Sequence, residues 1–113
     1  MDTSIEAQLA QLRQLYLKEL PLRMETIKTC LGRLHLDNWN PSEAAELHRH
    51  LHSLTGTAGT FGLQEISTLA REAERLLQPA AKSGDTPAAE HLQLLQSRLE
   101  QLQSLSGGIL EKS

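Results

Sequence analysis

Hydrophobic residues recur along most of the chain at intervals of three and four positions, with polar residues between them. This spacing places the hydrophobic side chains on one face of a helix, so it predicts amphipathic helices. The hydrophobic positions fall into successive segments: Ile5, Leu9, Leu12 and Tyr16; Met24, Ile27, Leu31 and Leu34; Ala44, Leu47, Leu51, Leu54 and Ala58; Ile66, Leu69, Ala70, Ala73, Leu76 and Leu77; Leu92, Leu95, Leu99 and Leu102. Each helix would have one face to bury against the others.

Residues that favour turns and helix ends separate these segments. The stretch LDNWNPSEAAE, residues 36–46, predicts a loop in which Asn40 or Ser42 caps the following helix. That helix is expected to end near Gly62, because glycine accepts the left-handed conformation that ends helices. The stretch QPAAKSGDTP, residues 78–87, is rich in proline and glycine and predicts the second loop.

Short connections between helices make neighbouring helices antiparallel, so that their hydrophobic faces bury each other. The predicted fold is therefore all-α, an antiparallel four-helix bundle. An additional short or kinked N-terminal helix is expected, because Pro21 favours a break or kink near Leu20. The bundle domain is expected to span residues 1–106, followed by a flexible tail over residues 107–113 that begins with two glycines.

The composition supports a single helical domain. The 113 residues are enough for one compact domain, leucine is abundant beside Glu, Gln, Arg and Ala, and the absence of valine leaves little material for strands. A net charge of −3 with interspersed signs, and only 3% aromatic residues, argue against a nucleic-acid-binding surface. We therefore expect an all-α domain that binds no nucleic acid.

The sequence shows no feature that would direct the chain to a membrane or to an oxidising compartment. Its first residues are polar and do not resemble a signal peptide, and no run approaches the roughly 20 apolar residues of a membrane span. The single cysteine, Cys30, cannot form an internal disulfide and belongs to no zinc motif. We expect a soluble, cytoplasmic monomer with Cys30 in the core or at its boundary.

Three histidines occur at alternate positions in LHRHLHSLTGTAGTFGL, residues 47–63, which ends in three closely spaced glycines. A helix turns by about 100° per residue. His50 therefore lies on one flank of the hydrophobic face, whereas His48 and His52, four residues apart, lie together on the other flank. The three histidines do not form one cluster, and for each of them a surface position without chemistry is an open alternative.

Two of the glycines, Gly56 and Gly59, lie on the same flank as His52. A glycine inside a helix costs roughly 1 kcal/mol relative to alanine, so a compensating role is expected. Bare backbone in the turns that follow His52 would let a neighbouring surface approach its ring. Close packing between helices is the alternative role for these glycines.

The segment HSLTGTAGTFG, residues 52–62, resembles the signature of the histidine-containing phosphotransfer (HPt) domains of bacterial multistep phosphorelays. The matching positions are His52, Leu54, Gly56, Gly59 and Gly62. The flanking stretches YLKELPLRMETI, NW and ISTLAREAERL are similar to the opening helix, a connecting loop and the helix after the signature in that family. The resemblance covers nearly the whole chain.

This resemblance implies a four-helix bundle in which His52 is phosphorylated. The phosphoryl group would come from an aspartyl phosphate on a receiver domain and pass to the aspartate of another receiver. The implied partners are receiver domains and a hybrid sensor histidine kinase. No glycine-rich loop followed by Lys-Ser or Lys-Thr is present, so we expect no nucleotide site and no autokinase activity. The domain would have no cofactor of its own, and the receiver would supply Mg²⁺.

One residue departs from the family pattern, which has lysine three positions after the histidine. Thr55 occupies that position and offers a hydroxyl group but no charge. His48 and Arg49 are candidates to supply positive charge in its place. The expected supporting or docking surface comprises His48, Arg49, Thr55, Gly56 and Gly59. The departure leaves open an alternative function, a docking module that binds a receiver or sensor kinase without being phosphorylated.

A metal site on the His52 flank would pair His52 with His48 and need a third ligand from His35 or His91. Because two ligands are too few for a structural zinc site, we predict no metal site. The remaining aromatic residues are expected to pack at helix ends, and the charged residues that follow Ala70 to form a solvated face. These residues are Tyr16, Trp39, Phe61, Arg71, Glu72, Glu74 and Arg75.

Overall fold

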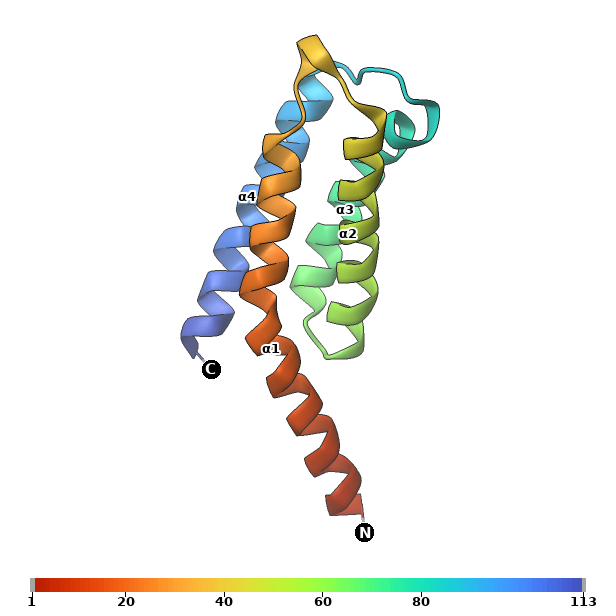
Figure 1. Cartoon of the computed structure of the whole chain (residues 1–113). Coiled ribbons are helices and arrows are strands. Elements are labelled where there is room, and N and C mark those ends of the chain that lie inside the picture. Colours follow the sequence, from red (N-terminus) through yellow and green to blue (C-terminus); the bar gives the residue numbers. More distant parts are fainter. Residues whose placement is uncertain (1, 113) are drawn as a thin grey trace.

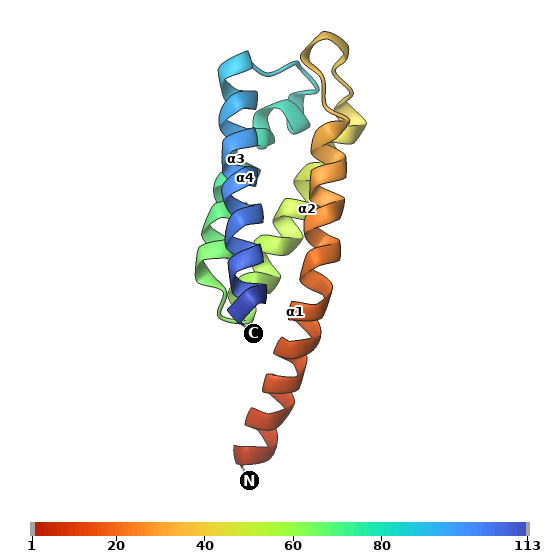
Figure 2. The ribbon, with the colours of Figure 1, turned by 90° about the vertical axis from the view of Figure 1, so that its left-hand side faces the viewer.

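The computed structural model describes residues 2–112, and the side chains of residues 4–111 within them. Its elements are α1 (Asp2–Gly32), the 3₁₀ turn η1 (Leu36–Asn38), α2 (Pro41–Thr60), α3 (Gln64–Ser83) and α4 (Ala89–Lys112). No strand occurs among the described residues. Consecutive helices run in opposite directions and pack side by side (Figures 1 and 2), so the predicted all-α four-helix bundle is confirmed. Within this range, no helix combines the length and the apolar character that crossing a membrane requires.

The hydrophobic faces of the four helices meet in one core. On α2 the predicted face is confirmed, since all of its positions are buried: Ala44, Leu47, Leu51, Leu54 and Ala58. Residues from the other helices complete the core, among them Leu20, Ile27, Ile66, Leu77, Leu95 and Leu102. Because α2 is buried along its length against α1 and α3, its two flanks have a defined orientation in the bundle.

The aromatic residues serve packing, as predicted, although Tyr16 lies in the middle of α1 rather than at its end. The Tyr16 ring stacks on Phe61 with ring centroids 4.9 Å apart. Its hydroxyl group shares a hydrogen bond of 2.9 Å with Thr57 Oγ1. Trp39 lies partly buried against the core just before α2 begins. These contacts tie both ends of α2 to the bundle.

Helix α1 runs from Asp2 to Gly32 without the break expected near Leu20. Pro21 removes only one backbone hydrogen bond and is exposed, so the helical turns on both sides of it continue. The first turns change direction relative to the rest of α1 and extend past the other helices (Figures 1 and 2). The N-terminal segment is therefore a bent part of α1 and not a separate helix.

The hydrophobic face of these first turns does not enter the core. Ile5, Leu9 and Leu12 remain 60%, 56% and 50% exposed, and of that predicted face only Tyr16 is buried. The prediction of burial is wrong here because the other helices end before they reach these turns (Figure 1). A helical period shows which side chains share a face, but not whether another element covers it.

Helix α3 is longer than predicted. It continues through Pro79 to Ser83 and ends at Gly84, which has a φ of +80°. The loop therefore begins at Gly84 rather than at residue 78. Ala80 is buried, so the turn that follows the proline packs into the bundle and remains helical.

Helix α4 also continues beyond its predicted end. It extends past residue 106 to Lys112, although a flexible tail was expected over residues 107–113. Ile109 and Leu110 pack partly buried against the core, which favours the helix over a frayed end despite the two glycines. Residue 113 lies outside the described residues, and the domain boundary at residue 106 stays a prediction.

Defined caps close both ends of α2. The Asn40 side chain accepts hydrogen bonds from the backbone N–H groups of Ser42 and Glu43, at 2.9 and 3.4 Å, which confirms Asn40 as the N-cap. At the other end, the chain leaves the helix at Phe61 and Gly62, and Gly62 adopts the expected left-handed conformation with a φ of +78°. The helix that carries the three histidines thus has the predicted bounds.

The Asn40→Ala variant should lower the free energy of unfolding by about 1 kcal/mol, because two N–H groups at the start of α2 lose their acceptor. Urea denaturation followed by circular dichroism measures this change. Ser42→Ala is the matched control, since only the backbone of Ser42 joins the cap, and it should change the free energy by less than about 0.5 kcal/mol. An equal loss in the two variants would contradict the role of the Asn40 side chain.

Candidate functional site

The three histidines of α2 lie on its two flanks, as helical geometry predicts. His48 and His52 share one flank, with nearly parallel rings whose centroids are 6.5 Å apart. His50 lies on the other flank, where its Nε2 is 3.8 Å from a carboxylate oxygen of Glu46. His52 has the most accessible side chain of the three, 75% exposed. Its ring is therefore open to a reaction partner that approaches from solvent.

A carboxylate from α3 holds the His52 ring. Glu74 Oε1 lies 2.6 Å from His52 Nδ1, and the Glu74 side chain is only 16% exposed. A carboxylate can only accept hydrogen bonds, so Nδ1 carries the proton and donates. The other nitrogen, Nε2, keeps its lone pair and has no hydrogen-bond partner among the described residues. Glu74 thus selects one tautomer and one orientation of the ring.

The prediction that the charged residues of 71–75 form only a solvated face is wrong for Glu74. The two arginines of this segment are exposed, as expected, but Glu74 faces α2. Helices α2 and α3 join near Leu63. His52 lies 11 residues before Leu63, and Glu74 lies 11 residues after it. Positions equally distant from the turn between two antiparallel helices lie at the same level, so this spacing is the only sequence signal for Glu74, and it does not show which side of α3 faces His52.

His48 lies beside the same carboxylate without forming a hydrogen bond to it. Its Nε2 is 3.8 Å from Glu74 Oε1, and this nitrogen is buried with no hydrogen-bond partner among the described residues. Glu74 thus stands beside two imidazoles, of which only His52 is bonded to it.

Thr55 and Arg49 meet the site in different ways. The Thr55 hydroxyl donates to the backbone carbonyl of Leu51 at 2.9 Å, and its distance to Glu74 Oε2 is 3.5 Å. The second contact is at the distance limit for a hydrogen bond. The main hydrogen bond of the hydroxyl is therefore the one to the backbone of its own helix. Arg49 is exposed, and its side chain forms no hydrogen bond or ion pair within the part of the chain that the structure describes. Its guanidinium group is therefore available to a partner.

The two helical glycines have different surroundings. Gly56 is exposed, and a Cβ atom there would meet no further atom within 4 Å, so the surface after His52 is open. Gly59 faces α3, where a Cβ atom would lie 3.4 Å from Ser67 Oγ. Ser67 is buried and donates to the Thr55 carbonyl at 2.7 Å, which holds the two helices together. Gly59 therefore faces the packed side of α2, where a Cβ atom would make an ordinary contact with Ser67, and its place on the docking surface stays a prediction.

The His52 flank does not bring together a set of metal ligands. His35 follows α1 and His91 lies on α4, and within residues 2–112 neither joins His48 and His52 in a group of three close metal-binding side chains. The acidic residue that does reach this flank is Glu74, which is hydrogen-bonded to His52. This flank therefore offers an exposed imidazole with a carboxylate partner.

Comparison with known proteins agrees with this arrangement. The family model described as the Hpt domain matches residues 11–105, which is most of the chain. No curated protein and no solved structure gives a match. Hpt domains act in phosphotransfer within two-component signalling, where they interact with receiver domains and kinases. With an all-α bundle, an exposed histidine in the matched helix and a family match over this length, the chain is a member of the Hpt domain family.

Proposed function

We propose that this domain is a histidine phosphotransfer protein whose His52 Nε2 accepts a phosphoryl group from the aspartyl phosphate of a receiver domain. It then passes the group to the aspartate of another receiver. The hydrogen bond between the largely buried Glu74 and the exposed His52 carries this proposal, because it leaves one ring nitrogen accessible with its lone pair. Receivers, and a hybrid sensor histidine kinase upstream of them, are the partners that this function requires.

The transfer forms a P–N bond at His52 Nε2 while the bond between phosphorus and the aspartyl oxygen breaks. The electron pair of the broken bond leaves with the aspartate carboxylate, and the reverse process delivers the phosphoryl group to the next receiver. The phosphorylated ring keeps its proton on Nδ1 and is cationic, so the Glu74 carboxylate, 2.6 Å away, stabilises it. Because the same hydrogen bond holds the ring before and after transfer, no reorientation is needed.

The negative charge of the phosphoryl group needs positive partners that Glu74 cannot supply. In this proposal Mg²⁺ held by the receiver neutralises part of it, and the domain needs no cofactor of its own. Arg49, exposed and three residues before His52, supplies positive charge from this domain, assisted by His48 when protonated. Gly56 leaves room for the receiver to approach. Arg49, Thr55 and Gly56 thus border the docking surface.

A phosphotransfer assay tests this function. A receiver carrying a labelled aspartyl phosphate is mixed with the domain in the presence of Mg²⁺. The label is expected to appear on the domain in an acid-labile, alkali-stable form and to disappear from the receiver. A domain that binds the receiver but acquires no label would refute the proposal and favour the alternative, a docking module that is never phosphorylated.

The Thr55→Lys variant is expected to lengthen the half-life of the phosphorylated domain by a factor of about 1.4 to 5. An ammonium group three residues after His52 would face the phosphoryl group, and exposed charge pairs contribute roughly 0.2–1 kcal/mol. The half-life is measured from the loss of label after the receiver is removed. Thr55→Met has a side chain of similar bulk without the charge, and it should behave like the wild type. If both variants lengthen the half-life equally, the added charge is not the cause.

A further inference from the structure

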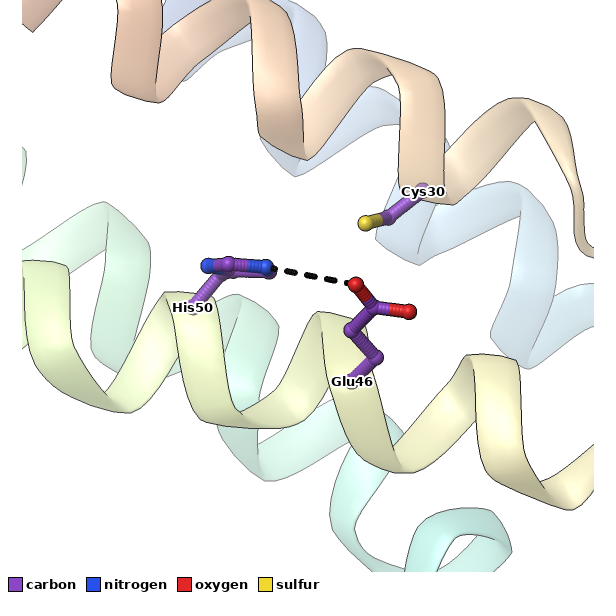
Figure 3. A group of neighbouring side chains, drawn as sticks. All are labelled: Cys30, Glu46 and His50. Carbon is purple, nitrogen blue, oxygen red and sulfur yellow. Dashed lines mark ion pairs between the residues drawn. The ribbon is translucent and has the colours of Figure 1, made fainter.

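Three side chains of metal-binding type meet between α1 and α2 (Figure 3). They lie on the flank of α2 opposite His52. Cys30 comes from α1, and Glu46 and His50 lie one turn apart on α2. The Cys30 Sγ, a carboxylate oxygen of Glu46 and a ring nitrogen of His50 all lie within 4.8 Å of one another. No other group of three such residues is this close in the part of the chain that the structure describes. The proposed phosphotransfer at His52 does not use these groups.

The distances in this cluster are close to those between the ligands of one zinc ion. His50 Nε2 and Glu46 Oε1 are 3.8 Å apart, which is too long for a hydrogen bond. Two ligands of a tetrahedral zinc ion lie about 3.4–3.6 Å apart, given Zn–N and Zn–O bonds of about 2.1 Å and Zn–S bonds of about 2.3 Å. Small rotations of the Glu46 and His50 side chains therefore suffice to bring the three atoms onto one ion.

The three groups have few competing interactions. Cys30 is 2% exposed, and its sulfur has no hydrogen-bond partner among the described residues. The side chains of Glu46 and His50 are 39% and 40% exposed, so solvent and ions reach the cluster from their side. A buried sulfur with two half-exposed ligands at its edge is a site that an ion can enter without opening the bundle.

The local electrostatics favour a cation. The Glu46 carboxylate places negative charge beside the Cys30 sulfur, and the positive charge of Arg33 opposes it. Glu43 adds to the negative potential, but its carboxylate is also 3.7 Å from the Arg33 guanidinium. A divalent ion would offset the carboxylates and take the sulfur as thiolate, with the thiol proton released to solvent.

We propose that Cys30, Glu46 and His50 bind one Zn²⁺ ion, with water as the fourth ligand. Sulfur, nitrogen and oxygen ligands in one set suit Zn²⁺, whereas Mg²⁺ and Ca²⁺ take oxygen ligands. The ion would join α1 to α2 through His50, which precedes His52 by two residues and lies on the opposite side of α2. It would therefore stabilise the folded bundle and raise its melting temperature.

Isothermal titration of the whole chain with Zn²⁺, in a reductant that is not a thiol, tests this site. We expect one ion per chain and a higher melting temperature in its presence. His50→Gln should weaken binding at least about 100-fold, because even partners that only hydrogen-bond to a metal ligand change affinity 10- to 100-fold. His91→Gln, which changes an exposed histidine of α4, should bind as the wild type does. Absence of stoichiometric binding by the folded wild-type chain would overturn the proposal.

Cobalt provides a second measurement that is specific for the sulfur. Co²⁺ bound at this site should give a thiolate-to-cobalt charge-transfer absorption, which Cys30→Ser should remove while circular dichroism shows an intact helical fold. The absorption should persist in His52→Gln, since that histidine lies on the other flank of α2. If Cys30→Ser keeps the absorption, or if His52→Gln loses it, the metal binds elsewhere and the assignment is wrong.

Discussion

The His52→Gln variant should acquire no label from a phosphorylated receiver, whereas the wild-type domain is labelled within the same time. Glutamine keeps a polar side chain at an exposed position, so the fold is expected to be retained. It lacks a nucleophilic nitrogen, because the lone pair of an amide nitrogen is delocalised into the carbonyl group, and no P–N bond can form. The effect is therefore a complete loss and not a reduced rate.

Two measurements make this result specific to His52. Circular dichroism and urea denaturation of His52→Gln should match the wild type, which separates lost chemistry from lost structure. His91→Gln, an exposed histidine on α4, should be labelled at the wild-type rate. Persistent labelling of His52→Gln would mean that another residue is phosphorylated, and the assignment of the nucleophile would then fail.

The Glu74→Gln variant should be phosphorylated about 10- to 100-fold more slowly than the wild type. Removing a carboxylate that hydrogen-bonds to a metal-ligating imidazole typically costs a factor of this size, and Glu74 orients the His52 ring in the same way. The glutamine amide can donate to His52 Nδ1, which moves the ring proton to Nε2 and removes the reactive lone pair. Glutamine also lacks the charge that stabilises the cationic phosphorylated ring. Single-turnover kinetics with an excess of phosphorylated receiver measure the rate.

A positioning role for Glu74 predicts more than a slower rate. Nitrogen chemical shifts of His52 should show the proton on Nδ1 in the wild type and a shift toward Nε2 in Glu74→Gln, which loss of stability alone would not cause. Glu72→Gln is the matched control on the same helix, because Glu72 pairs with Arg98 at 3.0 Å, and its rate should be unchanged. An unchanged rate in Glu74→Gln would exclude Glu74 from the mechanism.

The resemblance of the segment around His52 to HPt domains was visible in the sequence, and the family match over residues 11–105 confirms it. The same reasoning could not rank the individual residues of the site. Thr55 stood out because it replaces the expected lysine, yet its hydroxyl mainly donates a hydrogen bond to the backbone carbonyl of Leu51. Glu74 did not stand out, because nothing in its own segment distinguishes a carboxylate that faces a histidine from one that faces water.

The sequence by itself determined what lies within a single helix. The buried face of α2, a cap at Asn40 or Ser42 and the separation of His50 from His48 and His52 all follow from local rules, and the structure selects Asn40 as the cap. The physical reason is that backbone hydrogen bonds between residues four apart fix the helical period, and with it the relative direction of every side chain on the helix. No contact with another element is needed for these features.

The tertiary structure alone decided what depends on where different helices meet and end. It placed Glu74 of α3 against His52 of α2, and Cys30 of α1 beside His50 on the opposite flank. It also left the first turns of α1 uncovered and turned Gly59 toward Ser67 of α3. These outcomes depend on the length, the direction and the rotation of one helix relative to its neighbours, which arise from packing the whole core and not from any one segment.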